Sequence, residues 1–197
     1  MGNKYFTSDT HFSSYKVIER EFRPFNTSEE LNREVVNQWC TVLNKDDTIY
    51  HLGDFITYNY KDTKSWEEGL SVVKNIPCKV ILIIGNNEER LIARVFRGSF
   101  NKFKEYCLSL GFEDVVYNLE IEMRGVKFYL NHYPRKHKDG YVNLFGHVHL
   151  ASGIYKPFGL NVGCDLYHFR LLTEDMLFEI LRRKSTYWLT AIDINCI

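Results

Sequence analysis

Short apolar segments that end in a side chain able to bind a metal recur along this chain. The run Val80–Ile84 is followed by Gly85 and Asn86, and its unbroken apolar character favours a strand that is covered on both faces. Other predicted strands end in the same way, and the polar side chains that follow them are Asp9 with His11, Asp54, His132, and His147 with His149. In open α/β sheets, ligands bind at the edge where such loops leave the strands.

Amphipathic helices are expected between these strands. The segment 27–43 begins with a capping box formed by Thr27 and Glu30, and its apolar residues recur at i+4 spacing. Further helices are expected over 65–74, over 88–110 with an interruption near Gly98, and after a cap at Thr173. Early strand–helix alternation followed by strand-rich sequence predicts an α/β fold with a sheet sandwich.

The second half of the chain is predicted to be rich in strands. We expect two antiparallel strands over 115–123 and 126–131, joined at Arg124 and Gly125, and a last strand over 187–197. The helix that begins after Thr173 should bury Met176, Leu177, Ile180 and Leu181. Since the sequence contains no linker or repeat, we expect one domain over residues 1–197.

Composition limits the classes of partner. The 197-residue chain has 25 Lys and Arg residues against 25 Asp and Glu residues, so no global charge attracts nucleic acid or a membrane. The basic runs 135–138 and 182–184 are more typical of a solvated loop and of a helix C-terminal turn. The cysteines show no CxxC spacing, and the N-terminus has no apolar leader segment. We therefore expect a cytoplasmic protein that does not bind membranes.

The recurring side chains have the chemistry of a transition-metal site. On an extended chain, residues i and i+2 point to the same side, so Asp9 with His11, and His147 with His149, can each direct two donors to one place. Imidazole, carboxylate and amide donors without thiolate suit Mn, Fe, Zn, Co or Ni. Seven donors exceed what one catalytic ion needs. They suit two divalent ions about 3.5–4 Å apart that share a carboxylate.

Five short motifs resemble those of a known family. They read SDTHF, HLGDF, GNNEE, NHYP and GHVH in chain order, and together they resemble the motifs of the calcineurin-like metallophosphoesterases. The sequences RPF and YHLGDF are similar to a small bacterial and phage branch of that family. The resemblance implies a four-layer α/β/β/α sandwich with two metals at the strand ends. It also implies hydrolysis of a phosphate ester, a phosphodiester or phosphomonoester, by metal-bound hydroxide, with Mn as the preferred ion.

The same resemblance implies which side chain binds which ion. Asp54 would bridge the two metals. The first metal would be held by Asp9, His11 and His149, and the second by Asn86, His132 and His147.

Asn87 is the departure from the family pattern, which usually places a histidine there beside the leaving group. Asparagine cannot transfer a proton at neutral pH, and the loss of a general acid costs about 10²–10⁴-fold in rate. Three interpretations follow: a slower hydrolase in which the metals do most of the work, a hydrolase in which His51 or His137 replaces the histidine, and a regulatory protein that binds metal and a phosphorylated ligand without turnover.

The substrate is less constrained by the sequence. Arg23 and Arg135 are candidates for contacting a phosphate, although each is equally well explained as a surface charge. A small phosphorylated substrate or ligand is favoured over nucleic acid, and a nuclease is the less favoured alternative. The sequence makes no prediction about the oligomeric state.

Overall fold

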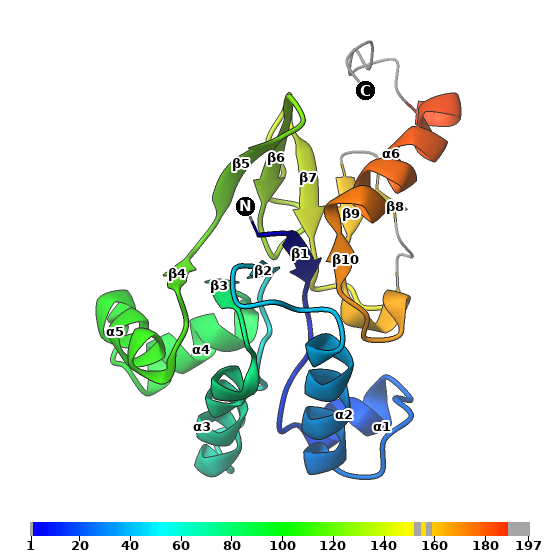
Figure 1. The fold of residues 1–197 in the computed structure, drawn as a ribbon. Helices are drawn as coiled ribbons and strands as arrows, with labels where there is room; N and C mark the ends of the chain where they lie inside the picture. Colours follow the sequence, from blue (N-terminus) through cyan, green and yellow to red (C-terminus); the bar gives the residue numbers. More distant parts are fainter. Residues whose placement is uncertain (1, 152–154, 157–158, 189–197) are drawn as a thin grey trace.

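Two β-sheets form the centre of the molecule. The structure is a computed structural model that describes residues 2–151, 155–156 and 159–188. In this described part, five strands form a first sheet in the order β10-β1-β2-β3-β4, and five form a second sheet in the order β5-β6-β7-β9-β8. Helices α1 to α5 gather on the side of the first sheet that faces away from the second (Figure 1). The predicted α/β sandwich class is confirmed.

The first sheet is mostly parallel. Strands β1 to β4 run in the same direction, and β10 pairs with β1 antiparallel. Their bounds are β1 Lys4–Thr7, β2 Thr48–His51, β3 Lys79–Ile83, β4 Asp114–Val116 and β10 Leu172–Thr173.

The second sheet is mixed. Strands β6, β7 and β9 are parallel, while β5 and β8 pair with their neighbours antiparallel. The bounds are β5 Leu119–Met123, β6 Val126–Leu130, β7 Val142–Phe145, β8 Tyr155–Lys156 and β9 Gly159–Asn161.

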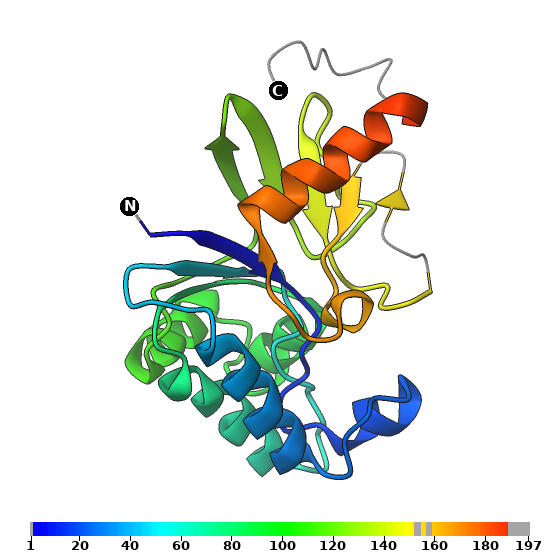
Figure 2. The same ribbon diagram turned by 45° about the vertical axis from the view of Figure 1, so that its right-hand side comes forward.

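Helices follow most strands of the first sheet. Figure 2 shows α1 to α5 below that sheet and α6 crossing the second one. The α-helices are α1 Tyr15–Arg20, α2 Ser28–Cys40, α3 Thr63–Ser71, α4 Asn86–Arg94, α5 Phe100–Leu110 and α6 Glu174–Trp188, and the 3₁₀ helices are η1 Val72–Asn75 and η2 Cys164–Tyr167. The predicted interruption near Gly98 is confirmed as the boundary between α4 and α5.

Local sequence explains the longer helices. The Thr27 hydroxyl accepts a hydrogen bond of 3.1 Å from the N–H of Glu30, so Thr27 caps α2 as predicted. The Glu30 carboxylate bonds to the N–H of Asn26 at 2.7 Å, which makes the motif a variant of the predicted box. Leu31 and Trp39, on one face of α2, are buried.

Two hydrophobic clusters divide the interior. The larger cluster lies between the first sheet and helices α2 to α5, and Phe55 and Trp39 are among its fully buried side chains. The smaller cluster joins the first sheet, the second sheet and α6, and in it Phe128 of β6 meets Phe178 of α6 edge to face. This shared core supports the expectation of a single domain over residues 1–197, which stays a prediction.

Three details differ from the expectations. The predicted strand 115–123 is two strands, because β4 pairs with β3 in the first sheet while β5 pairs with β6 in the second. The buried face of α6 contains Phe178, whereas Met176 is 39% exposed. Of the strand predicted over 187–197, residues 187–188 belong to α6 and the others lie outside the described residues.

The parallel strands place the polar motifs at one edge. Strands β1, β2 and β3 end at Thr7, His51 and Ile83, and the segments that follow them carry the predicted ligands. Strands β6 and β7 of the second sheet end beside them. Among the described helices, none is long and apolar enough to cross a membrane.

Candidate metal centre

The first group of predicted ligands lies after β1 and β7. The Nε2 atoms of His11 and His149 are 3.3 Å apart, and their rings stack with centroids 5.1 Å apart. A carboxylate oxygen of Asp9 is 4.0 Å from Nε2 of His149. Ligand atoms of these three residues fit within one coordination sphere, so this group could hold a metal ion.

The second group contains Asn86, His132 and His147. Oδ1 of Asn86 is 3.1 Å from Nε2 of His132 and 2.7 Å from Nδ1 of His147. The two histidine nitrogens are 3.2 Å apart. Asp9, Asp54 and His132 also form a cluster that could hold a metal. The seven side chains predicted from the sequence are therefore brought together.

Asp54 lies between the two groups. One of its carboxylate oxygens is 3.6 Å from Nε2 of His11, and the other is 3.6 Å from Nε2 of His132. Burial, and then the charge of Asp9, raise the pKa of Asp54, whereas His132 and the hydrogen bonds from Asn87 oppose the rise. A buried carboxylate between two sets of donors is well suited to be shared by two cations.

Hydrogen bonds fix which nitrogen of each histidine faces the centre. Nδ1 of His132 lies 2.8 Å from the carbonyl oxygen of Leu52, which can only accept, so this nitrogen carries the proton. The lone pair of Nε2 then points at Oδ1 of Asn86, another acceptor. Nδ1 of His149 is held in the same way by Asp165, at 2.8 Å. The atoms that face the centre are therefore hydrogen-bond acceptors that lie close to one another. A cation between them would be bound by their lone pairs, so the residues present fit a metal.

Backbone strain accompanies five of the ligands. Asp9, His11, Asp54, His147 and His149 all have positive φ values, from 43° to 74°. We expected extended chain to align residues i and i+2, and this expectation is wrong for both pairs. The left-handed conformation, which is rare for residues other than glycine, turns these side chains toward the centre instead.

Glycines allow the loops to pack tightly against the carboxylates. A Cβ atom on Gly85 would lie 2.4 Å from Oδ1 of Asp54, and a Cβ on Gly146 would lie 2.4 Å from Oδ2 of Asp9. Because neither distance is sterically possible, any other residue would displace a ligand.

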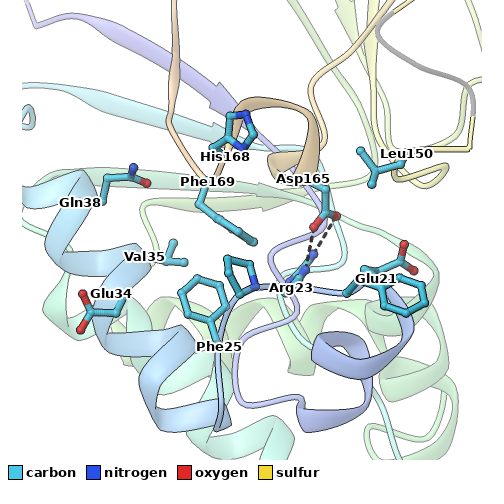
Figure 3. A pocket seen from close by; sticks show the side chains of 12 residues that line it. Glu21, Arg23, Phe25, Glu34, Val35, Gln38, Leu150, Asp165, His168 and Phe169 are labelled. Atoms are coloured by element: carbon cyan, nitrogen blue, oxygen red, sulfur yellow. Dashed lines mark hydrogen bonds and ion pairs between the residues drawn. The ribbon is translucent and has the colours of Figure 1, made fainter.

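Arg23 stabilises the first group through its contacts with Asp165 and with the backbone. Its guanidinium binds both carboxylate oxygens of Asp165, at 2.7 and 2.9 Å (Figure 3). It also donates to the carbonyl oxygens of Asp9 and Thr10. Its side chain is only 1% exposed. The expectation that Arg23 contacts a phosphate is wrong, because its donors are used to hold Asp165, which in turn orients His149.

Glu88 joins the loops after β2 and β3. Its carboxylate accepts four backbone hydrogen bonds, from the N–H groups of Gly85, Asp54, Phe55 and Ile56. Burial, and then the charge of Asp54, raise the pKa of Glu88 to about 7. The hydrogen bonds from Asp54 and Gly85 and the charge of His132 oppose this rise in the pKa. Together the four hydrogen bonds fix the position of Asp54 relative to α4.

Asn87 also holds Asp54. Its backbone N–H donates to one carboxylate oxygen of Asp54 at 2.9 Å, and its side-chain amide donates to the other at 2.6 Å. Its Oδ1 accepts from the N–H of Tyr58 at 3.1 Å. Asn87 is buried, so its amide orients the shared carboxylate and is not turned toward a leaving group.

The two candidate replacements for the missing histidine lie elsewhere. His51 is fully buried, with Nε2 2.9 Å from the Thr10 hydroxyl, and burial and then the charge of His132 lower its pKa to about 3. The expectation that His51 protonates a leaving group is therefore wrong. His137 is exposed, and its Nε2 is 3.6 Å from a carboxylate oxygen of Asp139.

The pKa values of the two histidines in the first group are shifted in opposite directions. Burial, and then the charge of Arg23, lower the pKa of His11 well below its usual value. Burial alone would also lower the pKa of His149, but its hydrogen bond to Asp165 and the charges of Asp9 and Asp165 raise it overall. His147 resembles His11, because burial and then His132 lower its pKa.

A cavity of about 510 Å³ opens onto both groups. Several residues that sequence reasoning missed line it beside the candidate ligands, among them Arg20, Glu21, Thr57, Tyr58 and Arg90. Arg90 was detectable in principle, because it lies in the first turn of the helix predicted over 88–110, four residues after Asn86. Asp165 was detectable too, since it follows the short strand β9 by a few residues, as the candidate ligands follow their strands. Arg135 is exposed, and among the described residues it is missing from the cavity lining.

Comparison with known proteins decides the family. The family model for calcineurin-like phosphoesterases matches residues 4–192. The chain belongs to the calcineurin-like phosphoesterase family. An uncharacterised protein of Methanocaldococcus jannaschii is 28% identical over 189 residues, 91% of each chain. The gene 66 protein of Mycobacterium phage L5 is 23% identical over 204 residues, 92% of this chain and 95% of that one.

A solved structure supports the fold of this phosphoesterase. A protein of unknown function from Aquifex aeolicus superposes with a TM-score of 0.62 at 22% identity, covering 91% of this chain and all of the other. The fold of this phosphoesterase is therefore that of its family, with two sheets and flanking helices.

Proposed function

We propose that this phosphoesterase hydrolyses a small phosphate ester with two divalent transition-metal ions. The observation that carries the proposal is Asp54, whose two oxygens each lie 3.6 Å from a histidine of a different group. Asp9, His11 and His149 would hold one ion, and Asn86, His132 and His147 the other. Mn is the preferred ion, with Fe, Zn, Co and Ni as alternatives, because the donors are imidazole and oxygen without thiolate.

The ions supply the chemistry of phosphoryl hydrolysis when they are bound, because they polarise phosphoryl oxygens and lower the pKa of a water molecule. The chain's own residues position this chemistry. Asn87 and Glu88 hold the segment of Asp54 in place, and Asp165 keeps Nε2 of His149 directed at the centre. A phosphate ester enters through the cavity lined by His147 and His149.

Protonation of the leaving group is the step for which Asn87 and His51 provide no proton. Asn87 binds Asp54 and His51 is buried, so neither gives a proton to a leaving alkoxide. We therefore expect slow turnover of alkyl esters and faster turnover of aryl esters, whose phenolates leave without a proton.

The test is Mn-dependent hydrolysis of bis(p-nitrophenyl) phosphate and p-nitrophenyl phosphate by the native protein and by Asp54→Ala. Turnover by the native protein, lost in Asp54→Ala, is the expected result. Equal rates in both proteins would overturn the proposal. The ratio of the two rates in the native protein would show whether a diester or a monoester is preferred.

A second candidate is a protein that binds metal and a phosphorylated ligand without turnover. The engagement of Asn87 with Asp54 favours it, because the centre then lacks a leaving-group acid. Asn87→His separates the two candidates. If the native protein binds Mn but is inactive while Asn87→His is active, the binding function holds. Steep salt dependence of binding to DNA or RNA would instead indicate the less favoured nuclease.

The proposed setting is a cytoplasmic protein that acts on a small phosphorylated compound and not on a membrane. The balance of acidic and basic residues supports this setting.

A further inference from the structure

Two arginines reach the cavity from different helices. Arg20 ends α1, and one of its terminal nitrogens is 3.4 Å from Nε2 of His149 in the first group. Arg90 lies on α4, four residues after Asn86 and three after Asn87, so it projects from the same face of that helix. Both line the cavity, Arg20 beside His149 and Arg90 one helical turn from Asn86 of the second group.

The rest of the lining has little positive charge to offer a phosphate. Thr57, Tyr58 and Asn87 are neutral, and Glu21 is acidic. Glu21 accepts a hydrogen bond of 2.6 Å from Nε of Arg20, which fixes that guanidinium beside the cavity. This bond does not use the two terminal nitrogens of the guanidinium. Among the described residues of the lining, Arg20 and Arg90 carry the permanent positive charges.

We propose that Arg90 and Arg20 bind the phosphoryl oxygens of the substrate, and that Arg90 supplies, beside the second group, the positive charge that Asn87 lacks. A guanidinium matches two phosphoryl oxygens at once, and its charge does not depend on pH. It stabilises negative charge but gives no proton, so it assists phosphate binding and charge development without acting as an acid. This inference deepens the proposed function and rests on it.

The chain offers a matched control for each arginine. Arg94 is one turn further along α4 and is exposed, so Arg94→Gln removes the same charge from the same helix away from the cavity. Arg33 forms with Glu34 the same adjacent pair, at 2.9 Å, that Arg20 forms with Glu21, and its side chain is 62% exposed against 61%. Arg33→Gln therefore controls for Arg20→Gln.

The first experiment measures binding of inorganic phosphate to the Mn-loaded full chain by calorimetry. Loss of a charged hydrogen-bonding group that contacts the anion should weaken binding about 10- to 100-fold in Arg90→Gln and by a smaller factor in Arg20→Gln. Arg94→Gln and Arg33→Gln should bind phosphate like the native protein. Arg90→Gln with native affinity, or with no more loss than Arg94→Gln, would overturn the proposal.

The second experiment separates a phosphate contact from a structural role. Mn content and thermal stability should be unchanged in Arg90→Gln, and Arg90→Lys should recover part of the phosphate affinity because it keeps the charge. A loss of Mn from Arg90→Gln equal to its loss of phosphate affinity would count against the assignment, since the arginine would then act through the metal ligands.

Failure of this inference is distinguishable from failure of the proposed function. If the native protein binds phosphate but hydrolyses no ester, the proposed hydrolase function is overturned. The comparison of Arg90→Gln with Arg94→Gln would still decide whether the arginines bind phosphate. A native Mn-loaded protein that binds no phosphate would overturn both.

Discussion

The half of the site proposed to face the metals and the half proposed to face the substrate are built differently; they are called the metal-facing half and the substrate-facing half below. The metal-facing side chains His11, Asp54 and His132 are each no more than 4% exposed, and hydrogen bonds from other segments fix them. The substrate-facing Arg20 is 61% exposed and makes its shortest bond to its neighbour in sequence. The metal geometry thus depends on the whole fold, whereas the substrate contacts depend on side chains that can change without altering it.

The largest effect is expected from Asp54→Asn, which breaks the metal-facing half. The substitution keeps the volume but removes the charge shared between the two groups. We expect Mn content to fall from close to two ions per chain to below one, and hydrolysis to fall at least about 10³-fold, by analogy with the several kcal/mol that metal ions contribute to phosphoryl transfer. Elemental analysis after reconstitution checks the content. Asp139→Asn, at a fully exposed position, is the control, and a full complement in Asp54→Asn would disprove the shared role.

Glu88→Gln tests how much the contacts of Glu88 with the loops after β2 and β3 stabilise the metal-facing half without a bound metal. An amide replaces a carboxylate that accepts four backbone bonds, and its NH₂ group would face N–H donors. The free energy of unfolding of the metal-free protein should fall by about 3 kcal/mol, which lowers the thermal midpoint by roughly 6–12 °C. Denaturant unfolding measures the free energy, and thermal unfolding measures the midpoint. Glu89→Gln, which affects only the bond from Tyr133 and an exposed ion pair with Lys136, should cost clearly less, and equal losses would contradict the interpretation.

Asp165→Asn sharpens the comparison within the metal-facing half. It weakens the bond that orients His149, while the supports of His132 and Asn86 are untouched. The affinity for one of two Mn ions should fall about 10- to 100-fold, and the other should be nearly unchanged. Stepwise calorimetric titration resolves the two. Equal weakening of both ions would indicate general loosening through Arg23 instead.

The smallest effect is expected from Arg135→Gln in the substrate-facing half. Arg135 is exposed in the segment after His132 and lies outside the cavity lining within the described residues. We expect less than about a 3-fold change in kcat/KM, which is the range of a screened surface charge. A change as large as that of Arg90→Gln would place Arg135 in the phosphate site and would confirm the sequence-based prediction for it.

The convergence of the seven candidate metal ligands was predictable because each follows a short predicted strand, a pattern that can be detected in a single sequence. The roles of Asn87 and Arg23 were not. Asn87 contacts Asp54, 33 residues away, and Arg23 contacts Asp165, 142 residues away. A single arginine in a sequence looks like a surface charge, and only this distant carboxylate explains the burial of Arg23.

The fold shows the same limit. Apolar residues recur from Val115 to Met123, so the sequence predicts one strand, with neither proline nor glycine to mark a break. The structure changes sheets at Tyr117 and Asn118, because β4 completes the edge of one sheet and β5 begins the edge of the other. Which sheet a short strand joins is decided by packing between distant elements, and local patterning does not encode it.

The wide spacing of the ligands along the chain has a kinetic consequence. His11 and His149 meet across 138 residues, and His132 meets Asn86 across 46, so neither group exists until both sheets have docked. Such late contacts cannot speed the search for the native topology. Metal binding should therefore leave the rate of folding almost unchanged and slow the rate of unfolding, so that the loaded protein persists through a high barrier to opening.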